Sequence, residues 1–459
     1  MVLLISTYDL GRQPFGLASG AASLRAAGVD VACADLAKER LQDDLVKRSD
    51  LIAFFLPMHT ATRLVLPVIA RVAALNPEAT LCAYGLYAPL NAPLLRSRGV
   101  SIVIGGEFED DLVAAALTRR AANSDGEQRD NPDLSSGPAP AGRAPLARVA
   151  FHVPFRDALP PLSRYATLQH GDQRLIAGYT EASRGCKHRC RHCPIVPVYD
   201  GRFRTVPVDV VLADARAQVA AGARHVTFGD PDFFNGIGHA VRVIERFARE
   251  CPGVSYDVTI KIEHLLRHAD VLPRLRDTGC AFVTSAVESV DDDVLAKLEK
   301  GHTREDFERA VELCREVGLI LTPTFVAFTP WTTLPGYCDM LQQIDRLDLV
   351  DHVAPIQLTI RLLIPEGSRL LELDDVRAVC RGFDPTSLIY PWTHPDPRVD
   401  VLHQELADLV GVKLTASRRD VFEAVWRRAH EAARMSLPRP LSGALPRAAI
   451  PYLNEPWYC

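Results

Sequence analysis

The sequence predicts an α/β protein: two domains, each built on a parallel sheet, followed by a helical C-terminal region. Two observations carry this prediction along the 459-residue chain. Patterns typical of buried strands alternate with helical patterns in two separate series, and a stretch without apolar periodicity lies between them. Strands that alternate with helices form parallel sheets covered by those helices. A chain of this length also exceeds one ordinary domain.

The first series covers residues 1–118 and predicts a small Rossmann-like domain. Its expected strands are short, apolar and bounded by turn residues. They are VLLIS (2–6), VDVACA (29–34), LIAFFLP (51–57), TLCAY (80–84) and VSIVIGG (100–106). The N-terminus lacks a basic start and a small-residue cleavage site, so we interpret it as a buried strand and not as an export signal.

Residues 119–148 are rich in Gly, Pro, Ser, Asn, Asp and Ala and show no apolar periodicity. A segment of this composition buries too little apolar surface to offset the entropy lost on ordering. We therefore expect a disordered linker between the two domains.

The second series, within residues 149–370, predicts six strand–helix units. Its expected strands are AGYTEASRG (177–185), ARHVTFGDPDF (223–233), VSYDVTIKI (254–262), CAFVTSAVES (280–289), LILTPTFVAFT (319–329) and VAPIQLTIRLLIP (353–365). Such a series predicts a partial (β/α)6 barrel of the TIM type, with its chemistry at the C-terminal ends of the strands. From 371 to 459 the pattern is helical and ends in an irregular tail.

Composition narrows the class of protein. The chain is 47% hydrophobic and 24% charged, with a formal net charge of -5. No basic excess indicates nucleic acid as a partner, which argues against RNA modification. No apolar run reaches the roughly 18–20 residues of a membrane span. We expect a cytoplasmic protein without a membrane partner.

The eleven cysteines are spread through a long chain without an export signal, so burial or metal binding is expected instead of disulfides. Seven lie in apolar or helical contexts and are expected to be small buried hydrophobes: Cys33, Cys82, Cys251, Cys280, Cys314, Cys338 and Cys380. Three others form a C-x3-C-x2-C cluster after the first strand of the second series: Cys186, Cys190 and Cys193.

Three thiolates in one short loop can bind zinc or iron. Structural zinc takes four ligands, and His188 or His192 would complete a Cys3His set. A cubane iron–sulfur cluster normally has four cysteine ligands, so three leave one iron open to a small molecule. A zinc-stabilised or redox-sensing binding protein without turnover therefore stays an alternative to an enzyme.

The segment RGCKHRCRHCP (184–194), placed after the first strand of a parallel partial barrel, resembles the radical S-adenosylmethionine (radical SAM) superfamily. The resemblance covers about residues 175–370. It implies an enzyme with a 4Fe–4S cluster on Cys186, Cys190 and Cys193, whose open iron binds S-adenosylmethionine. An electron from a donor such as flavodoxin or ferredoxin then breaks a sulfonium C–S bond, usually giving a 5′-deoxyadenosyl radical.

The same resemblance implies further cofactor contacts. His192, before the third cysteine, would pack near the adenine; the alternative is a surface histidine. Within GDPDF (229–233), the residues Gly229, Asp230, Pro231 and Asp232 would take the amino group of S-adenosylmethionine; the alternative is an ordinary turn.

AVES (286–289) resembles a segment of cobalamin-type radical enzymes, which implies that Glu288 and Ser289 face the ribose or methionine end of the cofactor. A helix cap is the alternative for Ser289. Arg361, like Lys261, would neutralise a carboxylate; the alternative is a solvated charge at a strand end.

The front domain resembles the flavodoxin-like domain of cobalamin-binding radical enzymes, and GGEFED (105–110) is similar to their last strand turn. The Asp-x-His-x-x-Gly motif that ligates cobalt is absent, since the first loop, YDLGRQPFG (8–16), has no histidine. One interpretation of the front domain is therefore that it binds cobalamin and that the enzyme transfers a methyl group through it. A domain that binds substrate or serves as structure is the other.

The tail NEPWYC (454–459) resembles the CUAEP/CCAEP-tail radical SAM (seleno)proteins, although this chain lacks everything after their first tail cysteine. The resemblance implies that Cys459 brings a thiol to the active site as substrate ligand or hydrogen-atom donor, and that a selenocysteine codon follows it. An aminocarboxypropyl transfer from S-adenosylmethionine to a thiophilic acceptor such as arsenite is an alternative. The substrate, a small molecule or a peptide, is not identified by the sequence.

Overall fold

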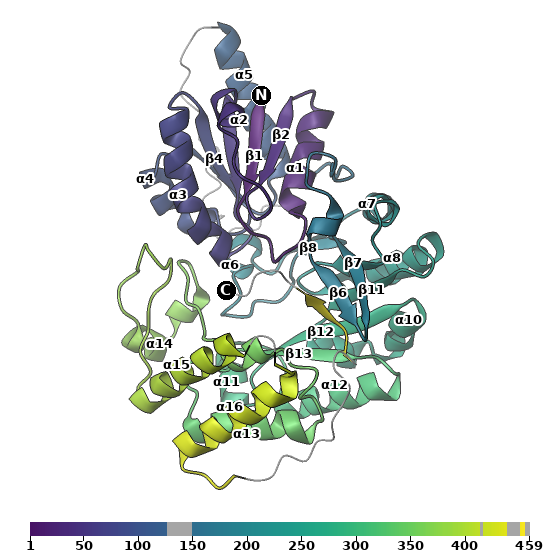
Figure 1. The fold of residues 1–459 in the computed structure, drawn as a ribbon, viewed down its shortest axis with the longest axis vertical. Coiled ribbons are helices and arrows are strands. Elements are labelled where there is room, and N and C mark those ends of the chain that lie inside the picture. The colour runs from purple at the N-terminus through teal and green to yellow at the C-terminus, as the bar shows by residue number, and fades with distance from the viewer. Residues whose placement is uncertain (126–148, 414–415, 438–449, 455–459) are drawn as a thin grey trace.

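The computed structural model describes residues 1–125, 149–413, 416–437 and 450–454. Figure 1 shows an N-terminal α/β domain above a second, curled sheet, with the C-terminal helices packed beside that sheet. The predicted fold class, a Rossmann-like domain followed by a radical-SAM-type partial barrel and a helical region, is confirmed. Within the described residues, no helix combines the length and the apolar character needed to cross a bilayer.

The N-terminal sheet is fully parallel, with strand order β2-β1-β3-β4-β5. This is the flavodoxin-like doubly wound order. Apolar side chains pack on both of its faces. Its elements are β1 (Val2–Ser6), α1 (Phe15–Ala26), β2 (Val31–Asp35), α2 (Asp43–Lys47), β3 (Leu51–Phe55), α3 (His59–Leu75), β4 (Thr80–Tyr84), η1 (Pro89–Asn91), α4 (Ala92–Ser97), β5 (Ile102–Ile104) and α5 (Glu109–Asp125).

Helix α5 continues to Asp125, so residues 119–125, expected to belong to the linker, are helical. Its first turn carries three carboxylates, which stabilise a helix N-terminus. The rest of the expected linker, 126–148, lies outside the described residues.

The second sheet has the order β13-β12-β11-β10-β7-β6-β14, with β7 to β13 parallel and the last two strands antiparallel. Its strands are β6 (Thr167–His170), β7 (Gln173–Thr180), β10 (His225–Phe228), β11 (Ser255–Thr259), β12 (Cys280–Glu288), β13 (Leu321–Phe325) and β14 (Tyr452–Asn454). A separate ribbon joins β8 (Ser183–Gly185) to β9 (Phe203–Thr205).

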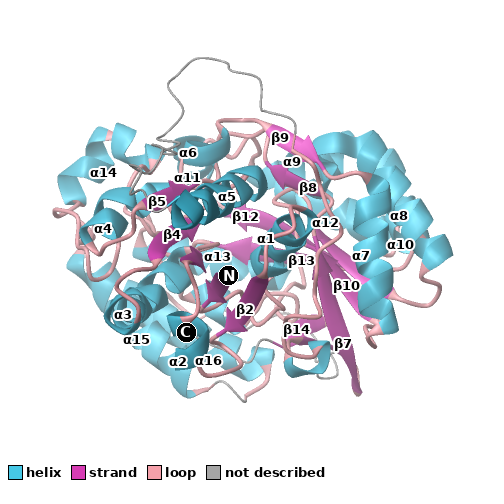
Figure 2. Cartoon of the chain, turned by 90° about the horizontal axis from the view of Figure 1, so that it is seen from above, coloured by secondary structure: helices cyan, strands magenta, loops and turns pink. Residues whose placement is uncertain are grey.

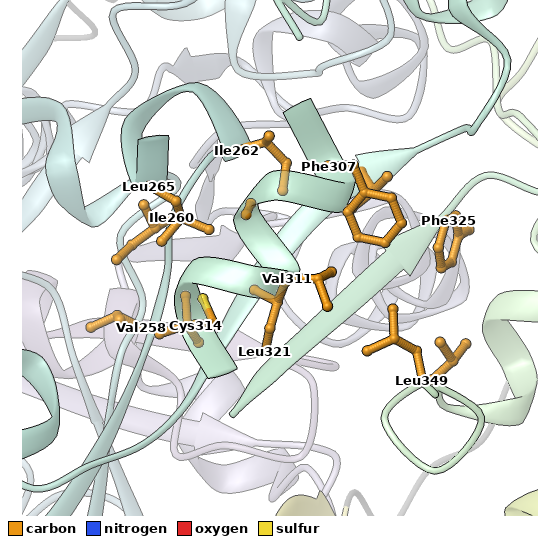
Figure 3. Close-up of a cluster of buried hydrophobic side chains, with 14 of the residues drawn as sticks. Val258, Ile260, Ile262, Leu265, Phe307, Val311, Cys314, Leu321, Phe325 and Leu349 are labelled. Atoms are coloured by element: carbon orange, nitrogen blue, oxygen red, sulfur yellow. The ribbon is translucent and has the colours of Figure 1, made fainter. Parts of the chain in front are cut away.

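Helices cover the outer face of this sheet, and Figure 2 shows α7, α8 and α10 lying together outside β7 and β10. Figure 3 shows the core that α12 shares with the strands, where Phe307 and Val311 of the helix meet Phe325 of β13. The helical elements of this part are η2 (Leu162–Arg164), α6 (Val196–Tyr199), α7 (Val208–Ala220), η3 (Phe233–Gly236), α8 (Ile237–Glu250), α9 (Ile262–Arg267), η4 (Ala269–Val271), α10 (Leu272–Asp277), α11 (Asp292–Lys297), α12 (Arg304–Glu316) and α13 (Leu334–Arg346).

The sixth predicted strand, 353–365, is not a strand. Residues Pro355–Leu358 form a 3-10 turn, η5, and one isolated bridge joins Phe328 to Arg361. Proline favours the first position of such a turn because it has no N–H to lose. The Gln357 side chain accepts the N–H of Phe325 at 3.0 Å, so a side-chain amide takes the place of a strand partner.

The C-terminal region contains η6 (Arg369–Glu372), α14 (Asp374–Val379), α15 (Pro397–Val412) and α16 (Arg418–Ala433). Helix α16 packs against α13 and α15. The chain then returns to the sheet as β14, which pairs with β6. All seven cysteines expected to be inert are free thiols, and Cys33, Cys82, Cys251, Cys314 and Cys338 are buried. Cys280 and Cys380 are partly exposed.

Candidate active site

The cysteine loop follows β7 and the short strand β8, at the carboxyl edge of the second sheet. Cys186 and Cys190 are buried, Cys193 is half-buried, and all three are free thiols. Burial raises the pKa of Cys193 to about 12, and the neighbouring Cys190 and Cys186 add to the rise. The sulfurs are therefore close enough to interact electrostatically. Because its pKa is raised, the Cys193 thiol would ionise to a thiolate only with a bound cationic group.

Two buried lysines face these thiols. Lys261 Nζ lies 3.9 Å from Cys190 Sγ. Burial by itself lowers the pKa of Lys300, but the charges of Glu288, Cys190 and Cys193 raise it above its ordinary value. Three thiols in one short loop, with ammonium groups near enough to offset the negative charge of thiolates, suit an iron–sulfur cluster, which cysteine thiolates bind.

The zinc alternative needs an imidazole as fourth ligand. His188 has one ring nitrogen 3.5 Å from Asp232 and the other 3.6 Å from Glu263. His192 Nε2 lies 3.1 Å from Glu288 Oε1. Both ring nitrogens of His188 and the Nε2 of His192 therefore lie beside carboxylates, and among the described residues no group of three or more potential ligand atoms that includes a cysteine lies within 4.8 Å of one another.

The GDPDF segment fixes the position of the cysteine loop. The Asp230 carboxylate accepts hydrogen bonds from Ala182 N at 3.0 Å and from Ser183 Oγ at 2.5 Å. Burial raises the pKa of Asp230 to about 7, against those two hydrogen bonds. Pro231 follows it, and a Cβ on Gly229 would lie 2.0 Å from the Tyr179 ring, so only glycine fits there.

Asn235, just after this segment, extends the same support. Its Oδ1 accepts the N–H of Lys187 at 3.2 Å, and its Nδ2 donates to the Gly185 carbonyl at 3.4 Å. Asp232 is fully buried and its Oδ1 accepts from Phe234 N at 3.3 Å, capping η3. The turn predicted as an alternative is thus present, with partners for both oxygens of Asp230 and for the Oδ1 of Asp232.

Glu288 ends β12 in the left-handed region, with a φ of 70°, where the register with β13 shifts. A non-glycine residue held there is strained, and such strain concentrates at functional sites. Its Oε1 lies 3.1 Å from His192 Nε2 and 3.4 Å from Lys300 Nζ. Burial by itself raises the pKa of Glu288, but Lys300 and then His192 lower it to about 2.

His302 completes this group, and the sequence reasoning missed it together with Lys300. The side chain is buried, and neither ring nitrogen has a hydrogen-bond partner among the described residues. Burial and then the charge of Lys300 lower the pKa of His302 to about 4. Both residues could have been predicted from the run EKGHT (299–303). It directly follows the helix after β12, the strand that carries Glu288.

The remaining predicted residues lie further from the thiols or outside the description. Ser289 Oγ accepts the N–H of Asp291 at 3.1 Å, a turn that leads into α11. Arg361 pairs with Asp400 at 2.8 Å and its guanidinium lies 3.5 Å from the centre of the Trp392 ring. Cys459 lies outside the described residues.

The N-terminal domain contacts the cysteine loop through ion pairs. Arg184, two residues before Cys186, is buried and pairs with Glu109 at 2.7 Å and with Glu181 at 3.0 Å. Glu109 begins α5, so the loop after β5 reaches the start of the cluster motif. A Cβ on Gly106 would lie 2.8 Å from the Tyr199 hydroxyl, which shows how closely GGEFED approaches α6.

Comparisons with known proteins agree with this arrangement. Residues 180–332 match the radical SAM superfamily. Over 344 residues the chain is 26% identical to the hopanoid C-3 methylase of Methylococcus capsulatus, covering 72% of this chain and 64% of that protein. Over 213 residues it is 26% identical to a tRNA-2-methylthio-N(6)-dimethylallyladenosine synthase of Chlorobium limicola, covering 44% and 46%. The chain spans less than two thirds of the length of both curated relatives.

Two solved structures share the fold. The cobalamin-dependent radical enzyme OxsB, with aqua-cobalamin bound, superposes with a TM-score of 0.69 at 14% identity, covering 94% of this chain and 71% of that chain. The methyltransferase TsrM from Kitasatospora setae, with tryptophan and a SAM analogue bound, gives 0.60 at 18% identity, covering 81% and 75%. Residues 180–332 are therefore a radical SAM domain, in a chain that has the fold of cobalamin-dependent radical SAM enzymes.

Proposed function

We propose that this protein is a radical SAM enzyme that carries a 4Fe–4S cluster on Cys186, Cys190 and Cys193. The observation that carries the proposal is the loop of three free thiols at the carboxyl edge of the sheet, near Lys261 and Lys300. When bound, the cluster supplies one electron to S-adenosylmethionine, which yields methionine and a carbon radical that acts on a small-molecule or peptide substrate.

The residues of this chain bind and orient the cofactor. The Asp230 carboxylate holds the segment before the cysteines, so Gly229, Pro231 and the backbone of the turn are what we place against the amino group. On the other side we place His192 near the adenine, and Glu288 and Ser289 toward the ribose or methionine end of the cofactor. His302 adds buried ring nitrogens that have no partner in the described part of the chain.

The first test is iron content and product analysis under strictly anaerobic conditions. Reconstituted protein is expected to hold roughly four irons per chain and, with a chemical reductant or a flavodoxin or ferredoxin, to convert S-adenosylmethionine to 5′-deoxyadenosine. The triple variant Cys186→Ala/Cys190→Ala/Cys193→Ala loses both. Cys251→Ala, a buried cysteine elsewhere in the fold, is the matched control and keeps both.

Two results would redirect the proposal. A brown, iron-replete triple variant would show that the cluster lies elsewhere. Methylthioadenosine without deoxyadenosine would mean that the other sulfonium bond breaks, as in aminocarboxypropyl transfer. Because an oxygen-sensitive cluster needs a reducing compartment, we place the protein in the cytoplasm.

A second candidate, cobalamin-dependent methyl transfer, is favoured by the fold shared with OxsB over 94% of this chain. The carboxyl edge of the N-terminal sheet faces the cysteine loop through Glu109 and Arg184. The loop 8–16 supplies no imidazole, so this chain would hold the corrin without a histidine on cobalt. The test is to mix the full-length protein with hydroxocobalamin and separate it by gel filtration. A corrin absorption spectrum that stays with the protein supports this candidate, and protein without corrin absorption removes it.

A further inference from the structure

Three side chains to which the proposed function assigns no role meet beside the cysteine loop, and one of them, Asp232, belongs to the segment predicted to take the amino group of S-adenosylmethionine. His188 comes from that loop, Asp232 from the turn after β10, and His264 from α9 after β11. One ligand atom of each lies within 4.8 Å of the others. Asp232 and His264 are fully buried, and the His188 side chain is 14% exposed.

Two of the three separations between ligand atoms match those around a tetrahedral metal ion. His188 Nε2 lies 3.3 Å from His264 Nε2 and 3.5 Å from Asp232 Oδ2. Donors bound to zinc at about 2.0–2.1 Å are separated by about 3.3–3.4 Å along the edges of a tetrahedron. Imidazole and carboxylate are also the ligands that catalytic zinc sites combine in sets of three.

Unsatisfied buried atoms point the same way. Asp232 Oδ2 lies 2.6 Å from His264 Nδ1, the ring nitrogen other than the one near His188, at ion-pair distance, yet neither of these two buried atoms has a partner with hydrogen-bond geometry in the described part of the chain. Buried polar atoms of this kind carry an energetic cost unless another group, such as an ion, satisfies them.

The surroundings of His188 supply a second layer. Its Nδ1 lies 3.6 Å from Glu263 Oε2, on the side of the ring away from His264. A carboxylate behind a ligating imidazole fixes the tautomer and raises the basicity of the nitrogen that faces the metal. Glu263 therefore has the place of a supporting carboxylate, and Lys261, 3.8 Å from it, balances its charge.

We propose that His188, Asp232 and His264 bind one divalent metal ion of the zinc class, separate from the iron–sulfur cluster. The ion joins the cysteine loop to the ends of β10 and β11. Three protein ligands leave one coordination position for water or for a donor atom of the substrate.

The test uses the full-length triple cysteine-to-alanine protein, so that the thiols take up neither iron nor zinc. After chelator treatment it is expected to bind one equivalent of Zn²⁺ in competition with a chromophoric chelator, and Co²⁺ is expected to give the visible absorption of a tetrahedral site. His188→Gln and His264→Ala each weaken Zn²⁺ at least tenfold. Glu263→Gln weakens it about tenfold through the lost support.

His268→Ala is the matched control, because His268 lies one turn after His264, outside the ligand set, and this variant keeps the affinity. Zn²⁺ also raises the melting temperature of the background protein and leaves that of its His188→Gln version unchanged. A folded background protein that takes up less than half an equivalent overturns the proposal, as does unchanged affinity in both histidine variants.

If the background protein unfolds, the cluster-loaded wild type replaces it. It is then expected to contain one zinc beside its iron, and His188→Gln is expected to lose the zinc alone; wild type without zinc overturns the proposal. The result is independent of the proposed radical chemistry, because the triple cysteine-to-alanine protein tests the metal site without a cluster.

Discussion

The two walls beside the cysteine loop are both built around buried carboxylates, but they use them differently. At the end of β10, Asp230 is committed to Ala182 and Ser183 of the chain segment that leads into the loop. At the end of β12, Glu288 sits in a strained conformation between His192 and Lys300, beside the unpartnered His302. The β10 wall therefore holds the segment that enters the loop, whereas the β12 wall, which touches His192 within the loop, presents charged and unpartnered groups to a ligand.

The largest expected effect comes from the β10 wall. Asp230→Ala leaves the N–H of Ala182 and the Ser183 hydroxyl without their acceptor, which costs roughly 2–4 kcal/mol of unfolding free energy. The loop that carries the thiols is then no longer held, so the iron content after reconstitution falls by more than half. Chemical denaturation and iron analysis measure the two effects. Asp270→Ala, on the surface, is the control; normal iron in Asp230→Ala would mean that this wall does not hold the loop.

The β12 wall is expected to behave in the opposite way. Glu288→Gln keeps the cluster, because the glutamine Oε1 can still accept a hydrogen bond from His192 of the loop, but it removes the charge that Lys300 and His192 face. Deoxyadenosine formation is expected to fall at least tenfold at unchanged iron content. Glu312→Gln, on the exposed surface of α12, is the matched control variant, and it is expected to keep both iron and activity. Equal losses of iron in Glu288→Gln and Asp230→Ala would erase the distinction between the walls.

His302 gives a pH-dependent test of the same wall. Its folded-state pKa is lowered to about 4 by burial, from 6.5 in the unfolded chain. Folding therefore favours the neutral ring, so the stability it contributes is present above pH 6.5 and is lost as pH falls toward 4. The loss is on the order of 3 kcal/mol. The unfolding free energy of wild type and His302→Gln, measured between pH 7 and 4, is expected to diverge accordingly, and parallel curves would contradict it.

The smallest effect on S-adenosylmethionine cleavage is expected at Cys459. Cys459→Ser cleaves the cofactor in the absence of substrate at the wild-type rate, since the predicted role of the tail thiol is toward the substrate. Its coupling to substrate conversion falls. The codon after Cys459 is the companion observation: an ordinary stop without a downstream AEP sequence removes the selenocysteine prediction, and full conversion by Cys459→Ser removes the role of the thiol.

The sequence could predict what short-range patterns encode. Alternating apolar runs gave both sheets, and the cysteine spacing located the loop after β7. The failure at 353–365 also has a local cause: an apolar run resembles a strand, but Gln357 takes the amide that a strand partner would have bonded.

The partners of the site residues were beyond such patterns. His264 lies 76 residues from His188, and Lys261 lies 71 residues from Cys190. These side chains come together because of the order of the strands in the curled sheet. No local spacing in the sequence encodes that order. The hydrogen bond from the Ala182 backbone to Asp230 could not be predicted for the same reason. The resemblance identified the segment, but not the direction in which its carboxylates point.

Gly229 has a consequence that reaches beyond the turn in which it lies. The Tyr179 ring that fills the space of its absent Cβ also packs edge-on against Phe15 of α1, at 5.9 Å between centroids, and lies 4.3 Å under the Arg12 guanidinium. One aromatic ring thus touches the turn beside the cluster loop on one side and the N-terminal domain on the other. Because these side chains are closely packed, a shift of one domain at the Tyr179 ring presses directly on atoms of the other domain. The two domains therefore do not hinge independently at this point.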